Sequence, residues 1–406
     1  MKAYLILADG MVFAGERFGS PREVICEMVF NTGLTGYLEL LTDASYAGQG
    51  IVMSSPIIGN YGVFTEQGEA SRPWAEAFIV RDLTRIINDE RDAEDLDDYL
   101  MRMDIPGIRG IDTRTLTLHL REQGTMNGMI TAGPEYNLDE CLPKIRAYVN
   151  ASPVARVSRR NVRIYPAGAS GRPHRGAMNH SPGCAGEFRA PADIRAARAD
   201  LAELPFSVDP AITTRYRVAM LDFGLKQNIV WNLTRRGCEV TVYPWDTPAA
   251  VFLAGRPDGI VLSNGPGDPV DCAPILPAMR AIYESQVPTL AICLGHQLLA
   301  LAVGASTRRL KYGHRGINHP VKDLAADRVY MTSQNHGYVV VDETIDPAVA
   351  QISYRHVNDG SVEGLRYAGR PIISIQYHPE GAPGPHDSEY LFDQFLVLMD
   401  QSRDQA

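Results

Sequence analysis

The sequence has 406 residues, 45% of them hydrophobic, which is enough to bury two or three separate cores. A formal net charge of −9 argues against nucleic acid as the main ligand, because phosphate binding requires a basic surface. No apolar run approaches membrane-spanning length, and Asp9 and Gly10 interrupt the first apolar stretch too early for a signal peptide. Six scattered cysteines without a Cys-x-x-Cys pair indicate a cytoplasmic protein with reduced thiols.

Residues 1–155 mix strand and helix patterns without regular alternation, which predicts a mixed α/β N-terminal domain whose topology stays open. The domain opens with a hairpin pattern, in which a turn at Asp9-Gly10 joins Ala3–Leu7 to Met11–Ala14. Further strands are expected at Val24–Phe30, Ile51–Ser54, Ala77–Val80 and Met126–Thr131. Helices are expected at Leu96–Met103, Thr113–Arg121 and Leu138–Val149.

Residues 156–215 have the composition of a long linker, rich in Arg, Ala, Pro and Gly. Pro166–Gly186 has no apolar periodicity and many helix and strand breakers, which favours a loop. We expect one short helix in this segment, over Ala192–Leu204.

Residues 216–406 alternate between buried strands and helices, which predicts a doubly wound, mostly parallel sheet. The expected strands of this repeat are Val218–Asp222, Glu239–Tyr243, Gly259–Leu262 and Thr289–Cys293, and its helices are Lys226–Arg236, Pro274–Ser285 and Leu294–Val303. Later strands are expected at Val329–Thr332, Val339–Val341, Ala350–Tyr354 and Ile372–Gln376, before a closing helix over Glu389–Met399.

Cys293 stands where a buried strand gives way directly to a helix, in Thr289-Leu-Ala-Ile-Cys-Leu-Gly-His-Gln297. A residue on such a turn presents its side chain at the carboxyl edge of the sheet, as a nucleophile elbow does. Gly295 permits the close approach that the turn needs, and the helix N-terminus would stabilise a thiolate. The five other cysteines lack this context and are interpreted as structural. The pattern therefore favours Cys293 as a nucleophile.

A thiolate nucleophile requires a base and a group that orients the base, and Ile375-Gln-Tyr-His-Pro-Glu380 offers both. In extended chain His378 and Glu380 point to the same side, so the carboxylate can fix the imidazole tautomer. An exposed turn would explain this motif if it stood alone. Together with the elbow, the motif predicts a Cys-His-Glu triad.

Two further segments bear on the site. The loop Leu262-Ser-Asn-Gly-Pro-Gly-Asp-Pro269 follows a buried strand and could supply backbone N–H groups to an oxyanion hole. His336 is more simply explained as a buried, satisfied histidine. Because no histidines or carboxylates show the spacing of metal ligands, the sequence predicts no metal site.

Taken together and in this order, Asn264-Gly-Pro-Gly-Asp-Pro269, Cys293-Leu-Gly-His-Gln297 and His378-Pro-Glu380 resemble the class I glutamine amidotransferase domain. The resemblance narrows to the small subunit family of carbamoyl phosphate synthase through segments of both halves. These segments include Phe30-Asn-Thr-Gly-Leu-Thr-Gly-Tyr37, Gly59-Asn-Tyr-Gly62, Gly107-Ile-Arg-Gly-Ile-Asp-Thr-Arg114 and Gly313-His-Arg-Gly-Ile-Asn-His-Pro320. The likeness covers nearly the whole chain outside the linker.

The resemblance implies that Cys293 attacks the amide of L-glutamine, that His378 shuttles protons and that Glu380 orients His378. It implies a γ-glutamyl thioester, and ammonia that passes through a tunnel to a large synthetase subunit, in a heterodimer or a higher assembly. That subunit would make carbamoyl phosphate from bicarbonate and ATP, for pyrimidine and arginine synthesis. The glutamine contacts implied by the family are Ser45, Gly265, Gly267, Leu294, Gln297, Asn335, Gly337 and Tyr338.

No phosphate-cradling G-x-x-x-x-G-K-S/T loop is present, so we expect no cofactor in this chain and expect ATP and Mg on the large subunit. Three alternatives stay open from the residues. A free-standing glutamine or γ-glutamyl hydrolase would share the triad but would not need Phe30–Tyr46. A regulatory scaffold would have lost Cys293 or His378, and an amidotransferase of another synthase would lack the N-terminal segments.

Overall fold

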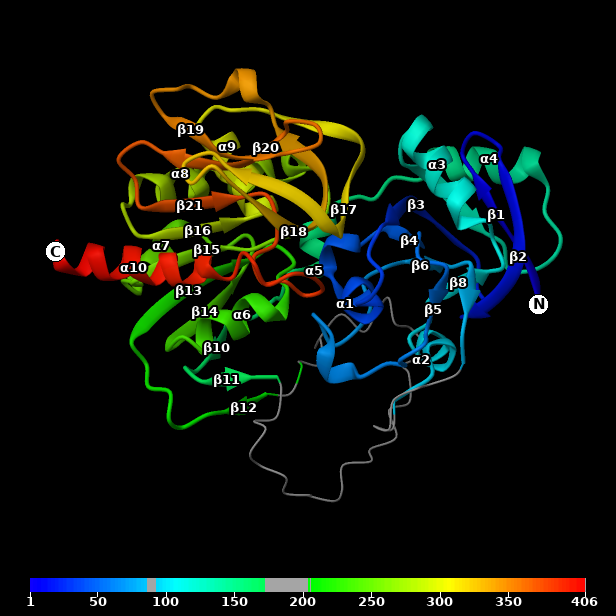
Figure 1. Cartoon of the computed structure of the whole chain (residues 1–406), viewed down its shortest axis with the longest axis horizontal. Coiled ribbons are helices and arrows are strands. Elements are labelled where there is room, and N and C mark those ends of the chain that lie inside the picture. The colour runs from blue at the N-terminus through cyan, green and yellow to red at the C-terminus, as the bar shows by residue number, and fades with distance from the viewer. Residues whose placement is uncertain (86–92, 172–203, 205, 406) are drawn as a thin grey trace.

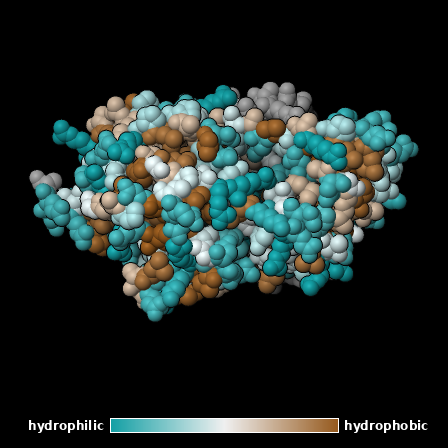
Figure 2. Space-filling model, turned by 90° about the horizontal axis from the view of Figure 1, so that it is seen from above, coloured by the Kyte–Doolittle hydropathy of each residue, from teal (hydrophilic) through white to brown (hydrophobic). Residues whose placement is uncertain are grey.

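The computed structural model of the chain describes residues 1–85, 93–171, 204 and 206–405. The N-terminal and C-terminal halves lie side by side, with the two termini at opposite ends of the molecule (Figure 1). No helix in these ranges has the length and apolar character needed to cross a bilayer. Hydrophilic and hydrophobic residues are interspersed over the face seen in Figure 2.

The N-terminal half is a closed barrel with strand order β1-β2-β8-β6-β4-β3-β9. The predicted hairpin is confirmed, because β1 pairs antiparallel with β2 and Gly10 has a φ of 96°. The barrel strands are β1 (Lys2–Leu7), β2 (Val12–Gly19), β3 (Val24–Asn31), β4 (Gln49–Met53), β6 (Ala77–Ile79), β8 (Pro106–Arg109) and β9 (Met126–Ile130). The other elements of this half are α1 (Tyr37–Thr42), η1 (Ala44–Tyr46), β5 (Ile57–Ile58), η2 (Thr65–Gln67), β7 (Asp82–Leu83), α2 (Leu96–Arg102), α3 (Thr113–Gln123) and α4 (Leu138–Ala147). The barrel is the topology that the sequence left open.

The C-terminal half is built on a ten-stranded sheet with the order β10-β14-β13-β15-β16-β21-β20-β19-β17-β18. Its strands are β10 (Arg163–Tyr165), β13 (Tyr216–Asp222), β14 (Cys238–Pro244), β15 (Gly259–Leu262), β16 (Thr289–Ile292), β17 (Thr307–Asp323), β18 (Arg328–Val340), β19 (Ala350–His356), β20 (Val362–Tyr367) and β21 (Ile372–Ile375). The helices are α6 (Gln227–Thr234), α7 (Ala249–Ala254), α8 (Leu276–Glu284), α9 (Leu294–Ala302) and α10 (Tyr390–Asp404), and two 3-10 turns are η3 (Pro269–Ile275) and η4 (Asp342–Thr344).

The five strands β14, β13, β15, β16 and β21 run parallel, and helices cover both of their faces. Alternate residues of β13 enter different cores: Met220 packs with α6 and α10, whereas Leu221 packs with α7, α8 and α9. Burial on both faces explains why these strands are continuous apolar runs in the sequence. The predicted doubly wound α/β fold is confirmed.

An antiparallel extension, β20-β19-β17-β18, continues the sheet beyond β21. Its pairing was not predicted, although the expected strand Ala350–Tyr354 lies within β19. The seventeen residues of β17 are rich in charged and polar side chains, so they lack the apolar alternation of a half-buried strand. Strand β18 joins the two predicted segments Val329–Thr332 and Val339–Val341 across a polar stretch. That stretch is buried because its polar groups bond to one another and to the N-terminal half.

Part of the predicted linker belongs to the large sheet. Arg163–Tyr165 forms β10 and pairs antiparallel with β14, and the Tyr165 ring lies 5.7 Å from the Trp231 ring. The short elements α5 (Pro153–Val157), β11 (Ala169–Ser170) and β12 (Ser207–Val208) flank it. A three-residue strand is too short to leave a periodic pattern. The domain limits themselves stay predictions, and the expected helix Ala192–Leu204 lies outside the described residues apart from Leu204.

Candidate active site

Cys293 occupies the turn between β16 and α9 with φ 52° and ψ −105°, in a region of backbone space that non-glycine residues avoid. Its N–H donates to the Ile375 carbonyl at 2.8 Å, which ties the turn to the neighbouring strand. A Cβ at Gly295 would lie 2.5 Å from the Leu262 carbonyl oxygen, so a glycine is needed where α9 crosses β15. The tight turn expected at Cys293 is confirmed.

The His378 imidazole and the Glu380 carboxylate form a buried ion pair, with Nδ1 2.7 Å from Oε1. Burial opposes a charged imidazole, but Glu380 and the Cys293 thiol outweigh it and raise the pKa of His378 to about 10. Burial also acts against the Glu380 carboxylate, yet Lys226 and His378 hold the pKa of Glu380 at about 2. The Nε2 atom of His378 has no hydrogen-bond partner among the described residues, which leaves it available to the thiol.

Lys226 is a member of this site that the sequence analysis missed. Its Nζ lies 2.9 Å from Glu380 Oε1 and also donates to the Ala382 carbonyl, and its side chain is 2% exposed. Burial disfavours the ammonium, but Glu380 and Glu69 raise its pKa above the ordinary value. A polar residue just beyond the carboxyl end of β13 was the available signal. The Lys226 ammonium thus compensates the charge of the buried Glu380 carboxylate, which would otherwise have His378 as its main partner.

Most of the expected glutamine-binding residues surround Cys293. Asn335, Gly337 and Tyr338 lie on β18, and the Asn335 carbonyl is 3.9 Å from the thiol sulfur. Leu294 begins α9, whose first N–H groups have no partner within the helix. Gln297 instead braces the site, because its Nε2 donates to the Tyr338 carbonyl at 2.7 Å and to Gln376 at 2.9 Å.

The loop after β15, which contains Gly265 and Gly267, packs closely against the turn at Cys293. A Cβ at Gly265 would lie 2.2 Å from the Phe223 carbonyl oxygen, and Gly267 has a φ of 93°. A side chain at Gly265 would meet backbone, whereas one at Gly267 would meet the Pro153 ring and would require a left-handed backbone conformation. Gln376, which was not among the expected residues, donates from Nε2 to the Cys293 sulfur at 3.6 Å. The Cys293 thiol is therefore surrounded by backbone N–H donors and amide side chains.

The N-terminal half supplies residues to the same site. Ser45 on η1 accepts a hydrogen bond from Asn264 at 3.0 Å, so this half lies against the site, and glutamine binding by Ser45 stays a prediction. Asp43, which the sequence analysis missed, accepts from the Ser45 N–H and from Asn335, each at 2.9 Å. Asp43 therefore connects the two halves, because it binds Ser45 of the N-terminal half and Asn335 of the C-terminal half.

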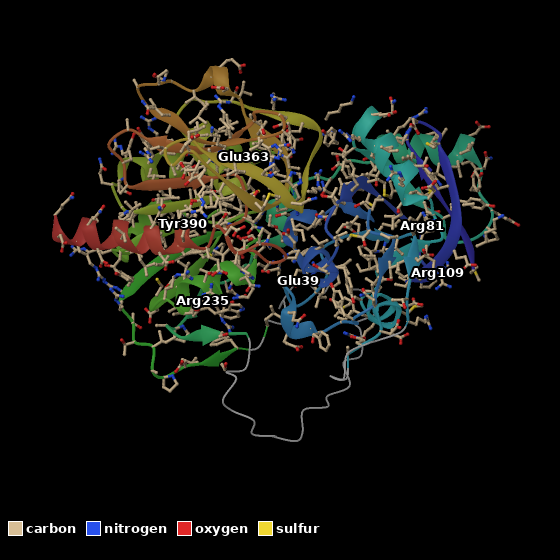
Figure 3. The ribbon with its side chains drawn as sticks, in the orientation of Figure 1. Glu39, Arg81, Arg109, Arg235, Glu363 and Tyr390 are labelled. Carbon is tan, nitrogen blue, oxygen red and sulfur yellow. The ribbon has the colours of Figure 1, made fainter. Side chains whose placement is uncertain are left out.

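Glu69 makes a second buried connection between the halves. Its carboxylate accepts from the Asn228 N–H at 3.0 Å and from the Asn228 side chain at 2.7 Å, at the start of α6. Burial raises the pKa of Glu69 to about 7, although Lys226 acts in the opposite direction. A cavity of about 380 Å³ opens between the halves nearby and is lined by Glu380, Glu39 and Arg235 among others. Figure 3 labels Glu39, from the N-terminal half, and Arg235, from the C-terminal half.

Comparisons with known proteins agree for both halves. Residues 219–398 match the family model described as glutamine amidotransferase class-I, and residues 5–130 match carbamoyl-phosphate synthase small chain, CPSase domain. The carbamoyl phosphate synthase small chain of Clostridium perfringens is 43% identical over 98% of this chain and 99% of its own length. That of Bacillus caldolyticus is 43% identical over 98% of this chain and 97% of its own.

The chain belongs to the carbamoyl phosphate synthase small chain family. Membership of this family accounts for both halves, since the barrel matches the part of the small chain that precedes the amidotransferase domain. The Symbiobacterium thermophilum small chain, 41% identical over 98% of each chain, shares this full length.

Proposed function

We propose that this chain hydrolyses L-glutamine as the glutaminase subunit of carbamoyl phosphate synthase and delivers ammonia to a large synthetase subunit. The observation that carries the proposal is the strained turn at Cys293 together with the buried His378–Glu380 pair. The family of the chain supports the same activity.

In the proposed reaction, the Cys293 thiolate attacks the carbon of the glutamine side-chain amide. His378 holds the thiol proton and gives it to the leaving nitrogen, so that ammonia departs and a γ-glutamyl thioester remains. Water, deprotonated by His378, then attacks the thioester and regenerates the thiol with release of glutamate. Glu380 and Lys226 take no part in bond formation, and they hold the imidazole in position and in its charge state.

We propose that glutamine is held by Ser45, Gly265, Gly267, Leu294, Gln297, Asn335, Gly337 and Tyr338. The N–H groups of Leu294 and Gly265 are our candidates for the oxyanion hole, because one begins α9 and the other lies against it. The contact between Ser45 and Asn264 supports a substrate site completed by the barrel.

The partner in this proposal is a large synthetase subunit, as a heterodimer or a higher assembly, which binds ATP and Mg and uses bicarbonate to form carbamoyl phosphate. We assign the product to pyrimidine and arginine synthesis, and one relative is named a pyrimidine-specific small chain. We place the reaction in the cytoplasm, in keeping with free thiols at the five described cysteines, which are Cys26, Cys141, Cys238, Cys272 and Cys293.

The first test is the glutaminase rate of the purified chain with and without a large subunit and ATP. We expect a low rate alone and a severalfold increase with the partner. A high rate that ignores the partner would favour the free-standing glutamine hydrolase and contradict the subunit proposal.

The second test is Cys293→Ser in the assembled enzyme. Glutamine-dependent synthesis should fall by more than about 10³-fold, because removing a triad nucleophile has effects of that order or larger. Synthesis from added ammonia should persist, since the thiol serves only ammonia release. Cys141→Ser, at a partly exposed cysteine outside the site, is the matched control. Loss of the ammonia-dependent reaction as well would mean that the substitution acts on assembly.

A further inference from the structure

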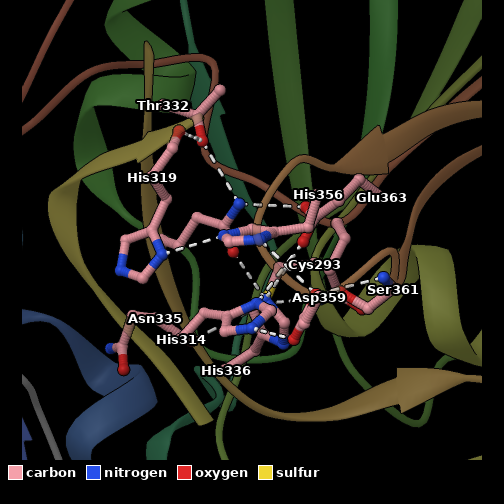
Figure 4. Close-up of polar contacts among 12 residues, drawn as sticks. Cys293, His314, His319, Thr332, Asn335, His336, His356, Asp359, Ser361 and Glu363 are labelled. Carbon is pink, nitrogen blue, oxygen red and sulfur yellow. Dashed lines mark hydrogen bonds and ion pairs between the residues drawn. The ribbon is translucent and has the colours of Figure 1, made fainter. Parts of the chain in front are cut away.

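Four histidines far apart in the sequence come together on the antiparallel extension of the sheet, beside the triad. They are His314 and His319 of β17, His336 of β18 and His356 of β19. Figure 4 shows them gathered with Glu363 of β20 and with Asp359. Sequence spacing predicted no metal site because these ligand types lie on four different strands.

Three members of this cluster converge on one point. His314, His336 and Glu363 each offer a ligand atom, and these atoms lie within 4.8 Å of one another. Glu363 Oε1 is 3.5 Å from His314 Nδ1 and 3.9 Å from His336 Nε2. Two ligand atoms about 2.1 Å from a tetrahedral zinc ion are about 3.4 Å apart, so the spacing accommodates one ion.

The remaining atoms of these three side chains are fixed in the way that metal ligands are usually fixed. His314 Nε2 faces the Asp359 carboxylate at 2.9 Å, and His336 Nδ1 faces the Tyr338 carbonyl at 2.8 Å. The second oxygen of Glu363 accepts from Gln334 at 3.0 Å. Ligating histidines typically donate their other N–H to a carboxylate or carbonyl, which sets the tautomer and aims the free lone pair at the metal.

Hydrogen bonds among the described residues leave the centre of the cluster unsatisfied. His314 Nδ1 and Glu363 Oε1 are buried and face each other at 3.5 Å, but neither has a hydrogen-bond partner among the described residues. His336 has an oxygen acceptor at each ring nitrogen, Tyr338 O at 2.8 Å and Gln334 Oε1 at 2.8 Å, but a neutral imidazole has one N–H. Reversing the Gln334 amide would turn its oxygen toward Glu363 instead. Either orientation leaves lone pairs facing one another, which a cation would satisfy.

We propose that His314, His336 and Glu363 form a binding site for a divalent transition-metal ion of the zinc class. Two imidazoles and one carboxylate suit this class, because such ions prefer nitrogen and mixed nitrogen–oxygen ligands. The side chain of Asp359 is 42% exposed and marks the route by which an ion reaches the buried ligands.

The second histidine group, His314, His319 and His356, is the weaker candidate. His356 Nδ1 accepts from the Asn358 N–H at 3.2 Å, so its Nε2 carries the hydrogen and donates to His319 Nδ1 at 3.1 Å. That hydrogen bond occupies His319 Nδ1 and His356 Nε2, although His319 Nε2 has no hydrogen-bond partner among the described residues, and this group contains no carboxylate. The ion therefore belongs on the Glu363 side of His314.

A metal at this position would tie β17, β18 and β20 together directly behind the glutamine-binding segment. His336 is flanked by Asn335 and Gly337, and the Asn335 carbonyl faces the Cys293 sulfur. The ion would be structural with respect to the reaction, since within the described residues the Cys293 sulfur contacts the Asn335 carbonyl and the Gln376 amide and bonds to none of the three ligands.

The test is to strip the full-length chain with a chelator and titrate it with Zn²⁺ against a chromophoric competitor. We expect one ion per chain, with X-ray absorption showing two imidazoles in its first shell and an anomalous difference peak between His314, His336 and Glu363. Glu363→Gln keeps the shape of the side chain and should weaken Zn²⁺ binding at least tenfold. Asp359→Asn, which acts through His314, should weaken it by about tenfold.

His386→Gln is the matched control, because His386 is 70% exposed and pairs with Glu389, where a surface ion could bind. This variant should bind Zn²⁺ as the wild type does. Absence of stoichiometric binding, an anomalous peak elsewhere, or equal affinity of the wild type and Glu363→Gln would overturn the proposal. If Glu363→Gln fails to fold, the peak position in the wild type and the affinity of Asp359→Asn still decide the matter. All of these readouts are independent of glutaminase activity.

Discussion

The proton on His378 is held by its neighbours over a wide pH range. In the native state the pKa of His378 is raised from 6.5 to about 10, and that of Glu380 is lowered from 4.5 to about 2. The histidine contribution to stability is therefore complete below pH 6.5 and is lost as pH rises through 10. The glutamate contribution is complete above pH 4.5 and is lost as pH falls toward 2.

Glu380→Gln should expose this dependence. Removing the carboxylate leaves the buried His378 without its partner and Lys226 without its nearest one, and should lower the free energy of unfolding by about 3 kcal/mol. The difference from the wild type should be largest between pH 4.5 and 6.5 and should shrink toward pH 10, as measured by urea denaturation across a pH series.

Glu389→Gln is the control for this measurement, because it breaks ion pairs with His386 and Arg235 that lie closer to solvent than the pair of Glu380. A pH-independent difference for Glu380→Gln would contradict the assigned charge states.

The elbow depends on how closely α9 crosses β15. A methyl group at Gly295 would meet backbone, the Leu262 carbonyl oxygen at 2.5 Å, which cannot move as a flexible side chain can. Gly295→Ala should therefore lower the free energy of unfolding by about 1–3 kcal/mol and displace the Cys293 turn, with loss of glutaminase activity.

Gly133→Ala serves as the control, since a Cβ at Gly133 would meet nothing within 4 Å. Equal stability of the two variants in urea denaturation would show that the crossing can relax.

At the scale of elements, the sequence was sufficient to predict a strand or turn where one class of residue dominates the segment. The parallel strands were predictable because burial on both faces makes them continuous apolar runs, and Cys293 was predictable because a strand meets a helix there. Strand β17 was not predictable, because its charged and polar side chains show no apolar alternation and because groups that it contacts, such as Asp359 beside His314, lie far along the chain. The sequence analysis missed Lys226, Asp43 and Glu69 for the same reason, since each bonds to a residue more than 100 positions away.

The two halves of the molecule share buried polar contacts, and Glu69 makes their connection sensitive to pH. Its pKa is raised from 4.5 to about 7, so the native state binds a proton more tightly than the unfolded chain. Stability from this group is complete below pH 4.5 and is lost as pH rises through 7.

Glu69→Gln should remove this dependence, since the amide cannot titrate, and should give a flatter profile of melting temperature between pH 4.5 and 8. The exposed Glu66 lies three residues away, and Glu66→Gln should retain the wild-type profile. An unchanged profile for Glu69→Gln would show that Glu69 is ionised throughout this range.

The positive φ of Cys293 has a consequence for the whole molecule. Holding a side chain in that region of backbone space costs about 1–3 kcal/mol, which glycine largely avoids. Alanine is ordinarily the more stabilising of the two small residues, but at this position Cys293→Gly should unfold at higher urea concentration than Cys293→Ala. Both variants would be inactive. The side chain that the proposed reaction requires therefore occupies a position that backbone energetics alone would assign to glycine, so a substitution that relieves the strain there also removes the proposed activity.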